Sequence, residues 1–396
     1  MDKLTKRRYA KYLIIILSQL AFGAGCTAYA SVCMLDLGYT NTTIGRVLFL
    51  GNLLAVLFQT RIAMIADRSK KISSTTLLLI IALITLASVV YCMIFPAKSF
   101  AYLAARVILL FGCDLLGPII VAYPTLLAYN GTPVNFELAR GLGSAIYGIT
   151  CAVLGPIIAR LGTKFVMQYG AAMLVIFCLG TVSMYSEKLE KPAVKLRQEE
   201  NANKKSSFKL IFGNKAFAVL LLGSVAMYYA NAYVDDYLFQ MLGRIGGTET
   251  DMGFLQGIMC VLELPAMALL YPFVRKNTNS LFAVKAGAVG FLLRTFALAV
   301  CPSVPLMYFF TVLQLVAYPL FTVASITYIN EIMDLSDCFR GQGLFGVATY
   351  CGNMLASLVG GRLIDGISVF GSSLVTVAIV AAGAVLICLI PKRKEA

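Results

Sequence analysis

Residues 73 to 95 read SSTTLLLIIALITLASVVYCMIF and contain no charged side chain. A helix needs about 20 mostly apolar residues to cross the hydrocarbon core of a bilayer, and this stretch is long enough to do so. Further stretches of the same length and character occur along the chain. The sequence therefore predicts twelve transmembrane helices, at about residues 12–35, 43–66, 73–95, 99–127, 137–160, 164–186, 215–242, 251–274, 281–301, 304–330, 341–363 and 368–390.

The composition of the whole chain is that of a polytopic membrane protein. Hydrophobic residues make up 59% of the 396 residues and charged residues 13%, and the mean hydropathy is +0.83. Soluble globular proteins contain about 45–50% apolar and about 25% charged residues. Even a large soluble domain leaves too much surface exposed to hide so many apolar side chains. These values exclude a soluble domain, a disordered chain and a disulfide-rich scaffold.

The Lys and Arg residues are unevenly distributed along the chain. There are 33 of them against 19 Asp and Glu, which gives a formal net charge of +14. They gather at the N-terminus, in the segments 66–73, 187–215 and 275–285, and at the C-terminus. Because cytoplasmic loops are enriched in Lys and Arg, we expect both termini in the cytoplasm and a location in the cell inner (plasma) membrane. No basic face interleaved with aromatic residues occurs, so we expect no nucleic-acid partner.

The sequence divides into two halves. A long polar stretch from 187 to 215 separates six predicted spans from six, and it is either a flexible linker or a segment in contact with lipid headgroups. Residues 140–143, Arg-Gly-Leu-Gly, open the fifth span, and residues 340–343, Arg-Gly-Gln-Gly, open the eleventh. Such repeats are typical of transporters that rock two bundles about a central site. We expect an all-α membrane protein with two pseudo-symmetric six-helix bundles, at residues 1–186 and 215–396, and a cytoplasmic linker at 187–214.

A loop motif lies at the end of the second span. Asp67-Arg68-Ser69-Lys70-Lys71 resembles the loop motif of the major facilitator superfamily, in which a Gly precedes the Asp by four residues; Ala63 takes that place here. The resemblance implies a gate in which Asp67, Arg68 and Lys71 lock the cytoplasmic helix ends in one conformation. Taken without the resemblance, an acid followed by cations at a helix C-terminus indicates interfacial anchoring.

Several charged residues fall inside the predicted spans, where a charge is costly and marks a functional candidate. They are Arg106 and Asp114 in the fourth span, Asp235 and Asp236 in the seventh, Glu263 in the eighth and Arg294 in the ninth. A spacing of eight residues predicts that Arg106 and Asp114 lie on about the same helix face. They form either a structural charge pair with a neighbouring helix or a proton or substrate site.

These intramembrane charges predict a means of coupling protons to conformation. We expect Arg294 to pair with Glu263 or Asp236, because protonation of the acid would then release the arginine. The expected proton-coupling residues are Glu263, Arg294, Asp235, Asp236 and Arg106.

The fifth span resembles the lactose-permease branch of the superfamily, which contains oligosaccharide and nucleoside:proton symporters. That branch has a sugar-binding Arg near the start of this span, a Gly three residues later and a stacking aromatic residue seven residues after the Arg. Arg140, Gly143 and Tyr147 occupy these places here. The resemblance implies that Arg140 and Tyr147 bind the substrate; the alternative is that Arg140 only anchors the loop at the inner mouth.

The second half continues this resemblance and departs from it at one place. Glu263-Leu264-Pro265 matches the essential acid of the branch, and Arg294 matches its coupling arginine. In the tenth span, Gln314 and Ala317 stand where the permease has a His and a Glu, and the chain has no His at all. A His–Glu proton relay is therefore impossible, and lactose itself is not implied. The expected substrate-binding residues are Arg140, Tyr147, Asp114, Asn231, Tyr233 and Gln314.

Together these features predict a secondary transporter that imports a small polar solute, a sugar or a nucleoside, together with protons by alternating access. The chain has no phosphate-binding Gly-x-x-x-x-Gly-Lys-[Ser/Thr] loop, so we expect the proton gradient to supply the energy and no cofactor to be needed. Without His or clustered Cys we expect neither an enzyme nor a metal site. The expected partners are the small-molecule substrate and the lipid bilayer, and we expect a monomer. The alternative is a drug/proton antiporter that exports lipophilic cations, because Gly155-Pro156 matches part of an antiporter signature.

Overall fold

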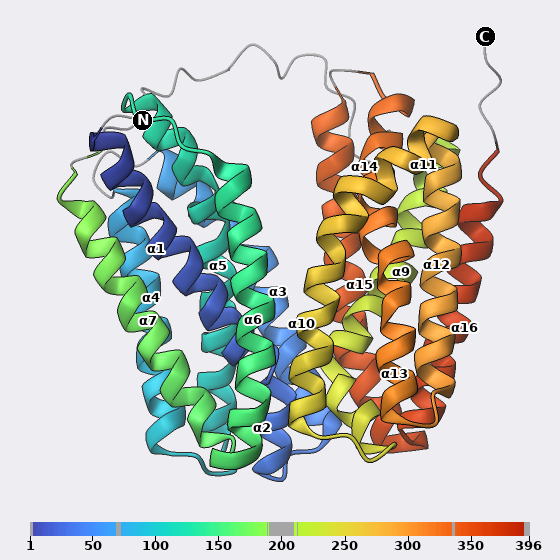
Figure 1. The fold of residues 1–396 in the computed structure, drawn as a ribbon, viewed down its shortest axis with the longest axis horizontal. Coiled ribbons are helices and arrows are strands. Elements are labelled where there is room, and N and C mark those ends of the chain that lie inside the picture. Colours follow the sequence, from blue (N-terminus) through green and yellow to red (C-terminus); the bar gives the residue numbers. More distant parts are fainter. Residues whose placement is uncertain are drawn as a thin grey trace. The chain divides into compact units, whose positions relative to one another are not determined.

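The computed structural model of the protein describes residues 3–68, 73–187, 189, 210–211, 213–334 and 337–391. Every regular element in this part of the chain is a helix. Twelve of its segments are helical, long and apolar enough to cross a membrane, which confirms the prediction of an all-α membrane fold. The chain divides into two compact units, Met1–Leu196 and Arg197–Ala396, whose helices are labelled in Figure 1.

The first unit is built from seven helices within the described residues, two of which form the first span together. They are α1 (Lys3–Cys26), α2 (Ala30–Asp36), α3 (Asn41–Arg68), α4 (Ser74–Ile94), α5 (Phe100–Tyr129), α6 (Phe136–Leu161) and α7 (Lys164–Tyr185). Three of them begin at a side chain that accepts a hydrogen bond from a backbone N–H three residues later: Ser73, Ser99 and Asn135. Such caps satisfy N–H groups that have no partner inside the helix. At Gly162 the backbone takes a positive φ of 81° and ends α6, a conformation that favours glycine.

Apolar side chains and glycines pack these helices together. α1 lies against α6 and α7, and α4 lies against α5 and α7. The buried cluster includes Tyr12, Leu78 and Phe177. A Cβ added at Gly25 would lie 2.8 Å from the ring of Tyr169, so glycine is what allows α1 and α7 to approach this closely. Large apolar side chains such as Leu179 are exposed on the outside of the unit, as a lipid-facing surface requires.

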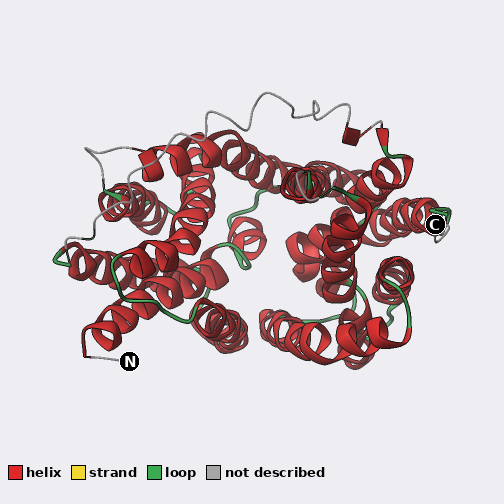
Figure 2. Cartoon of the chain, turned by 90° about the horizontal axis from the view of Figure 1, so that it is seen from above, coloured by secondary structure: helices red, strands yellow, loops and turns green. Residues whose placement is uncertain are grey.

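The second unit contains the other helices named for the described residues; Figure 2 shows the chain from above, with its helices in red. They are α9 (Lys215–Gly243), α10 (Glu249–Pro265), the π-helix η2 (Ala266–Leu270), α11 (Tyr271–Asn277), α12 (Ser280–Val300), α13 (Val304–Thr311), the 3₁₀ helix η3 (Val312–Val316), α14 (Tyr318–Ile332), α15 (Cys338–Ile367) and α16 (Val369–Cys388). α9 packs against α15 and α16, and α12 packs against α14 and α16. Two spans of this unit thus contain short π or 3₁₀ pieces.

Glycines on α12 accommodate one of these irregular spans. A Cβ added at Gly287 would lie 2.7 Å from the Cα of Phe321, and one added at Gly290 would collide with the carbonyl oxygen of Val316. A backbone atom cannot rotate away as a side chain can. The close approach of α12 to the junction of η3 and α14 therefore requires glycine at both positions.

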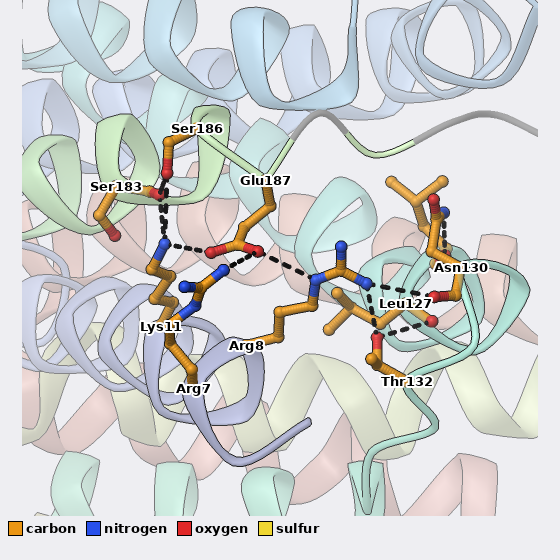
Figure 3. A network of polar contacts seen from close by, with 10 residues as sticks. Arg7, Arg8, Lys11, Leu127, Asn130, Thr132, Ser183, Ser186 and Glu187 are labelled. Atoms are coloured by element: carbon orange, nitrogen blue, oxygen red, sulfur yellow. Dashed lines mark hydrogen bonds and ion pairs between the residues drawn. The ribbon is translucent and has the colours of Figure 1, made fainter. Parts of the chain in front are cut away.

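Near the N-terminus, one carboxylate binds three cations of α1 (Figure 3). Glu187, just after α7, accepts from Arg7 at 2.8 Å, from Arg8 at 3.1 Å and from Lys11 at 2.5 Å, and its side chain is 2% exposed. Arg8 also donates to the carbonyl oxygen of Asn130, after α5, at 3.1 Å. The cluster joins α1, α5 and α7 at one end of the unit. Glu187 was expected to be the first residue of a polar linker, and instead it is buried.

The surroundings of Glu187 shift its pKa. Burial alone would raise that pKa, but hydrogen bonds from Lys11, Arg7 and Arg8 outweigh it and lower the pKa of Glu187 from 4.5 to about 2. A carboxyl group with a lower pKa in the folded state binds its proton less well there than in the unfolded chain. Its contribution to the free energy of unfolding is therefore complete above about pH 4.5 and is lost as the pH falls toward 2.

We expect Glu187→Gln to lower the free energy of unfolding at pH 7 by on the order of 2 kcal/mol, because three cations lose their common carboxylate. Thermal unfolding of the detergent-purified protein between pH 6 and pH 2.5 is the measurement. The Tm of the wild type should fall below about pH 4.5 more steeply than that of the variant. As a control, Glu331→Gln removes a 43%-exposed carboxylate that binds Arg275 and should cost less. Identical pH profiles for Glu187→Gln and the wild type would contradict this account.

Candidate functional site

A buried arginine in the second unit is held by an amide that also binds an acid. Arg294, on α12, is 1% exposed. Its Nη1 donates to Asn231 Oδ1 at 3.0 Å, and its Nη2 lies 3.2 Å from Met259 Sδ. Asn231 Nδ2 in turn donates to Asp235 Oδ2 at 2.8 Å. Since Asn231 and Asp235 are one helical turn apart on α9, both present their side chains on the same face.

Two carboxyl groups act electrostatically on this arginine, those of Asp235 and Glu263. Both interact electrostatically with Arg294, and both are partly buried. The arginine is linked to Asp235 through the amide of Asn231 rather than by a direct ion pair. Of the two partners expected for Arg294, Glu263 interacts with it electrostatically, whereas Asp236 binds α15 instead, as described below. Successive residues on a helix point about 100° apart, so Asp235 and Asp236 cannot both face α12.

Glu263 lies at the end of α10 and has an amide partner from another span. Gln314 Nε2 donates to Glu263 Oε1 at 3.5 Å, and Gln314 is 3% exposed. Both residues lie next to irregular backbone: Pro265 precedes the π-helix η2, and Gln314 itself is part of η3. Proline has no N–H to continue the helical hydrogen bonds, and π and 3₁₀ segments inside long helices often mark functional sites.

Asp236 takes part in a separate contact between α9 and α15. Ser357 Oγ donates to Asp236 Oδ2 at 2.5 Å, and the hydroxyl of Tyr237 donates to the carbonyl oxygen of Ser357 at 2.5 Å. Tyr237 has non-helical torsion angles, φ −122° and ψ 18°, and kinks α9 at this point. The kink in α9 is therefore held by side chains bound to α15.

Tyr233 is not brought together with Asn231, although both were expected to contact the substrate. The hydroxyl of Tyr233 lies 3.3 Å from Ser373 Oγ on α16, and its ring lies against that of Tyr237 with 5.5 Å between centroids. Side chains of residues that are two positions apart on a helix, such as Asn231 and Tyr233, point about 200° apart around its axis. Tyr233 accordingly packs between α9 and α16, on the far side of α9 from Arg294.

The first unit holds the other residues expected to bind the substrate. Arg140 is exposed near the start of α6, and Tyr147, two turns later, is partly buried. Between them, Gly143 packs against Leu20 of α1, where a Cβ would collide. Asp114 is exposed on α5. The expected roles of these residues stay predictions.

Arg106 and Asp114 do not share a helix face. Arg106 is fully buried in the core of the first unit, whereas Asp114 is exposed. A separation of eight residues rotates a side chain by two full turns and about 80° more. This rotation places Arg106 in the core and Asp114 at the surface. Arg106 Nη2 donates to the carbonyl oxygen of Cys26 at 3.3 Å, and Nη1 lies 3.7 Å from Met167 Sδ.

The predicted gate falls mostly at the edge of the described chain. Asp67 and Arg68 are in the last turn of α3, and Lys71 lies outside the described residues. The gate therefore stays a prediction.

Two residues of the polar contacts were not predicted from the sequence. Met259 precedes Glu263 by four residues, so helix geometry places both on the same face of α10, and this spacing could have predicted that Met259 lies near the site. Ser357 is one of many hydroxyl residues in apolar spans, and nothing in its local sequence distinguishes it.

Twelve apolar helical segments within the described residues, arranged in two compact units, define a polytopic membrane protein. The model of the MFS_1 like family matches residues 10–375. The chain belongs to this family, and it is accordingly a major facilitator transporter rather than an enzyme.

Solved structures of other transporters have the same fold. A point variant of the nucleoside transporter NupG superposes with a TM-score of 0.79 at 16% identity, over 97% of this chain and 100% of that one. A bacterial homolog to the human lysosomal transporter Spinster gives a TM-score of 0.70 at 14% identity, over 98% and 97% of the two chains. An auto-inhibited POT family peptide transporter gives 0.72 at 10% identity, over 96% of each chain. At these identities the likeness shows the fold alone. No curated protein matches the chain significantly in sequence.

The link between Arg294 and Asp235 predicts non-additive effects on stability. Arg294→Met or Asp235→Asn alone leaves one charge without its counterpart, and each should lower the free energy of unfolding by about 2–4 kcal/mol. The double variant removes both charges and should be more stable than the less stable single variant. Thermal unfolding in detergent measures this, with Ser357→Ala combined with Arg294→Met as an additive control. Additive losses in the first pair would show that the two charges do not interact.

Proposed function

We propose that the protein imports a small polar solute, a sugar or a nucleoside, together with protons, by alternating access. The observation that carries the proposal is the arrangement of Arg294, Asn231 and Asp235, in which one amide links a buried cation to an acid. A charged group inside a membrane is costly and is retained where it serves transport. Membership of a transporter family supports this use of the arrangement.

The arrangement supports a specific way of coupling protons to solute binding. When Asp235 is charged, Asn231 donates to it and directs its own oxygen toward Arg294. A proton on Asp235 removes the negative charge that balances the guanidinium. A hydrogen bond from Arg294 to a new acceptor then stabilises the guanidinium, and a hydroxyl group of the solute supplies that acceptor. Proton binding and solute binding favour each other in this scheme, as coupled transport requires.

Glu263 offers a second protonatable position in the same unit. Its carboxyl group interacts electrostatically with Arg294 and accepts a hydrogen bond from Gln314. Protonation of Glu263 would weaken both its electrostatic interaction with Arg294 and the hydrogen bond that it accepts from Gln314. We therefore assign Glu263 and Asp235 to the proton pathway, while Asp236, bound to Ser357, contributes by setting the kink of α9.

The side chains in and around this arrangement suit a neutral solute rich in hydroxyl groups. Amides such as Asn231 and Gln314 both donate and accept, carboxylates accept and a guanidinium donates, and a hydroxyl group can pair with each of them. In the first unit, the resemblance to the lactose-permease branch assigns Tyr147 to stacking on a sugar or base ring. The fold likeness to a nucleoside transporter supports the inclusion of nucleosides. We further propose a monomer in the plasma membrane with cytoplasmic termini, as the charge distribution predicts.

A thermal-shift screen of the detergent-purified protein tests the substrate class. The panel contains monosaccharides, disaccharides, nucleosides and lipophilic cationic dyes, because a ligand of the folded state raises the Tm. We expect a sugar or a nucleoside to stabilise the protein, and we expect Arg140→Ala to weaken its binding about tenfold or more. Arg160→Ala, at the other end of α6, is the matched control. Stabilisation by lipophilic cations alone would reject the importer in favour of the drug/proton antiporter.

Transport in proteoliposomes tests the coupling role of Glu263. With the solute identified by the screen, Glu263→Gln should abolish accumulation driven by a pH gradient and retain solute exchange, because exchange needs no net proton movement. Glu249→Gln, in the first turn of the same helix, should accumulate solute as the wild type does. Full pH-driven accumulation by Glu263→Gln would remove Glu263 from the coupling mechanism.

A further inference from the structure

The beginning of α1 carries more positive charge than the described residues around it neutralise. The helix contains no acidic residue, and its cations are Lys3, Lys6, Arg7, Arg8 and Lys11. Among the described residues, the carboxylate that binds these cations is that of Glu187, which Arg7, Arg8 and Lys11 share (Figure 3). One carboxylate therefore serves three of the five cations, and the other two have no acid bound to them in the described part of the chain.

Three of these cations lie on one exposed face of the helix. Lys3, Lys6 and Arg7 are exposed, and at about 100° of rotation per residue they fall within about 100° of the circumference of α1. Lys3 and Lys6 make no hydrogen bond or ion pair with another described residue. Arg7 reaches Glu187 through Nη2, and 61% of its side chain is still exposed, whereas the side chain of Glu187 is 2% exposed. The carboxylate is buried, so the exposed face outside it is cationic.

The same face of α1 is apolar further along the helix. Ala10 and Ile14 follow Arg7 on this face, and both are exposed. Ile14 lies about 10 Å beyond Arg7 along the axis, because each residue of a helix rises about 1.5 Å. The headgroup layer of one leaflet is about 5–8 Å thick. When the cations are level with the headgroups, Ile14 is therefore level with the acyl chains.

Helix α7 continues the apolar surface beside α1. A Cβ added at Gly180 would lie 2.9 Å from a side-chain carbon of Ile14, so Ile14 packs against α7 at this glycine. Leu179 and Val182, which flank the glycine, are 65% and 52% exposed. Ile14, Leu179 and Val182 thus form an exposed apolar seam along the contact of the two helices.

An exposed tyrosine on α7 marks the level of the headgroups. Tyr185 is 62% exposed, and the next residue, Ser186, accepts a hydrogen bond from Lys11 Nζ at 3.4 Å. Tyr185 therefore lies at the same end of the first unit as the cations. Tyrosine is enriched at the interface between membrane and water, which supports placing the cationic face among the headgroups and the seam below it.

We propose that the exposed cations Lys3, Lys6 and Arg7, together with the apolar seam, bind an acidic phospholipid of the surrounding bilayer. The lipid phosphate supplies the negative charge that the exposed cations lack, and the acyl chains lie along the seam. A lipid fits better than a soluble anion because the cationic and apolar parts are continuous and about one headgroup apart. A zwitterionic lipid binds less well, since its own cation opposes the three cations of α1. The surface is independent of the arrangement around Arg294, which belongs to the other unit.

Titration of the detergent-purified full-length protein with phosphatidylglycerol tests the proposal, with phosphatidylcholine of the same acyl chains as the zwitterionic reference. Phosphatidylglycerol should raise the Tm by on the order of 2 °C in a saturable manner, and phosphatidylcholine should raise it less. The difference should shrink when the salt concentration is raised from about 0.05 M to about 0.5 M, because salt screens exposed charges.

Two pairs of substitutions separate this surface from a general attraction between cations and acidic lipids. Lys3→Gln combined with Lys6→Gln removes two exposed cations and keeps the contacts of Glu187, and it should raise the half-saturating concentration of phosphatidylglycerol about tenfold. Arg160→Gln combined with Lys164→Gln is the matched control, because both cations are exposed and lie where α6 ends and α7 begins, at the other end of α7 from Tyr185. The control pair should keep the half-saturating concentration of the wild type.

Glycerol phosphate presents the phosphate without acyl chains, and at the same concentration it should leave the Tm unchanged. Native mass spectrometry gives a second readout, in which the wild type should retain phosphatidylglycerol under conditions where the variant with Lys3→Gln and Lys6→Gln loses it. Equal stabilisation by glycerol phosphate would overturn the proposal in favour of a site for soluble phosphate. Equal stabilisation by the two lipids would overturn it as well, and so would equal losses of affinity in the two pairs of substitutions.

Discussion

A charge in the hydrocarbon interior of a membrane has no water to bind, so it must find its partners within the protein. Much of this structure follows from that constraint. In the second unit, Asn231 joins Arg294 to Asp235, so the cation and the acid are linked without a direct ion pair. At the end of the first unit, where headgroups and water are near, three cations gather on Glu187. An uncompensated buried charge would cost several kcal/mol.

The same constraint explains where the backbone departs from regular helix. A broken helix leaves N–H and C=O groups unpaired, and in a membrane this is tolerated only where polar groups or protein surround the break. The irregular segments of the second unit occur at Tyr237, after Pro265 and around Gln314. Each is next to an acid or an amide, so the polar side chains and the deformable backbone coincide. Asp236 and Glu263 therefore lie beside backbone that departs from regular α-helix.

The fold was readable from the sequence because twelve apolar stretches and the distribution of Lys and Arg are properties of single segments. The members of the candidate site were partly readable, since Arg294, Asn231 and Glu263 are polar residues in apolar spans. Their partners were not, because pairing depends on the rotation of each helix about its axis. Asp235 and Asp236 are adjacent in the sequence, yet Asp235 binds Asn231, which links it to Arg294, whereas Asp236 binds Ser357. The same sensitivity to rotation separates Arg106 from Asp114.

The binding of α1 to Glu187 also determines when the first unit can be completed during synthesis. Lys11 and Glu187 are 176 residues apart, and a ribosome that adds about 5–20 residues per second needs on the order of ten seconds or more to make that length. During that interval the cations at the start of α1 cannot bind Glu187 and are free to contact lipid phosphates. The carboxylate emerges just as the last helix of the first unit is finished. The cations of α1 can therefore meet their common carboxylate only after every span of the first unit has been made.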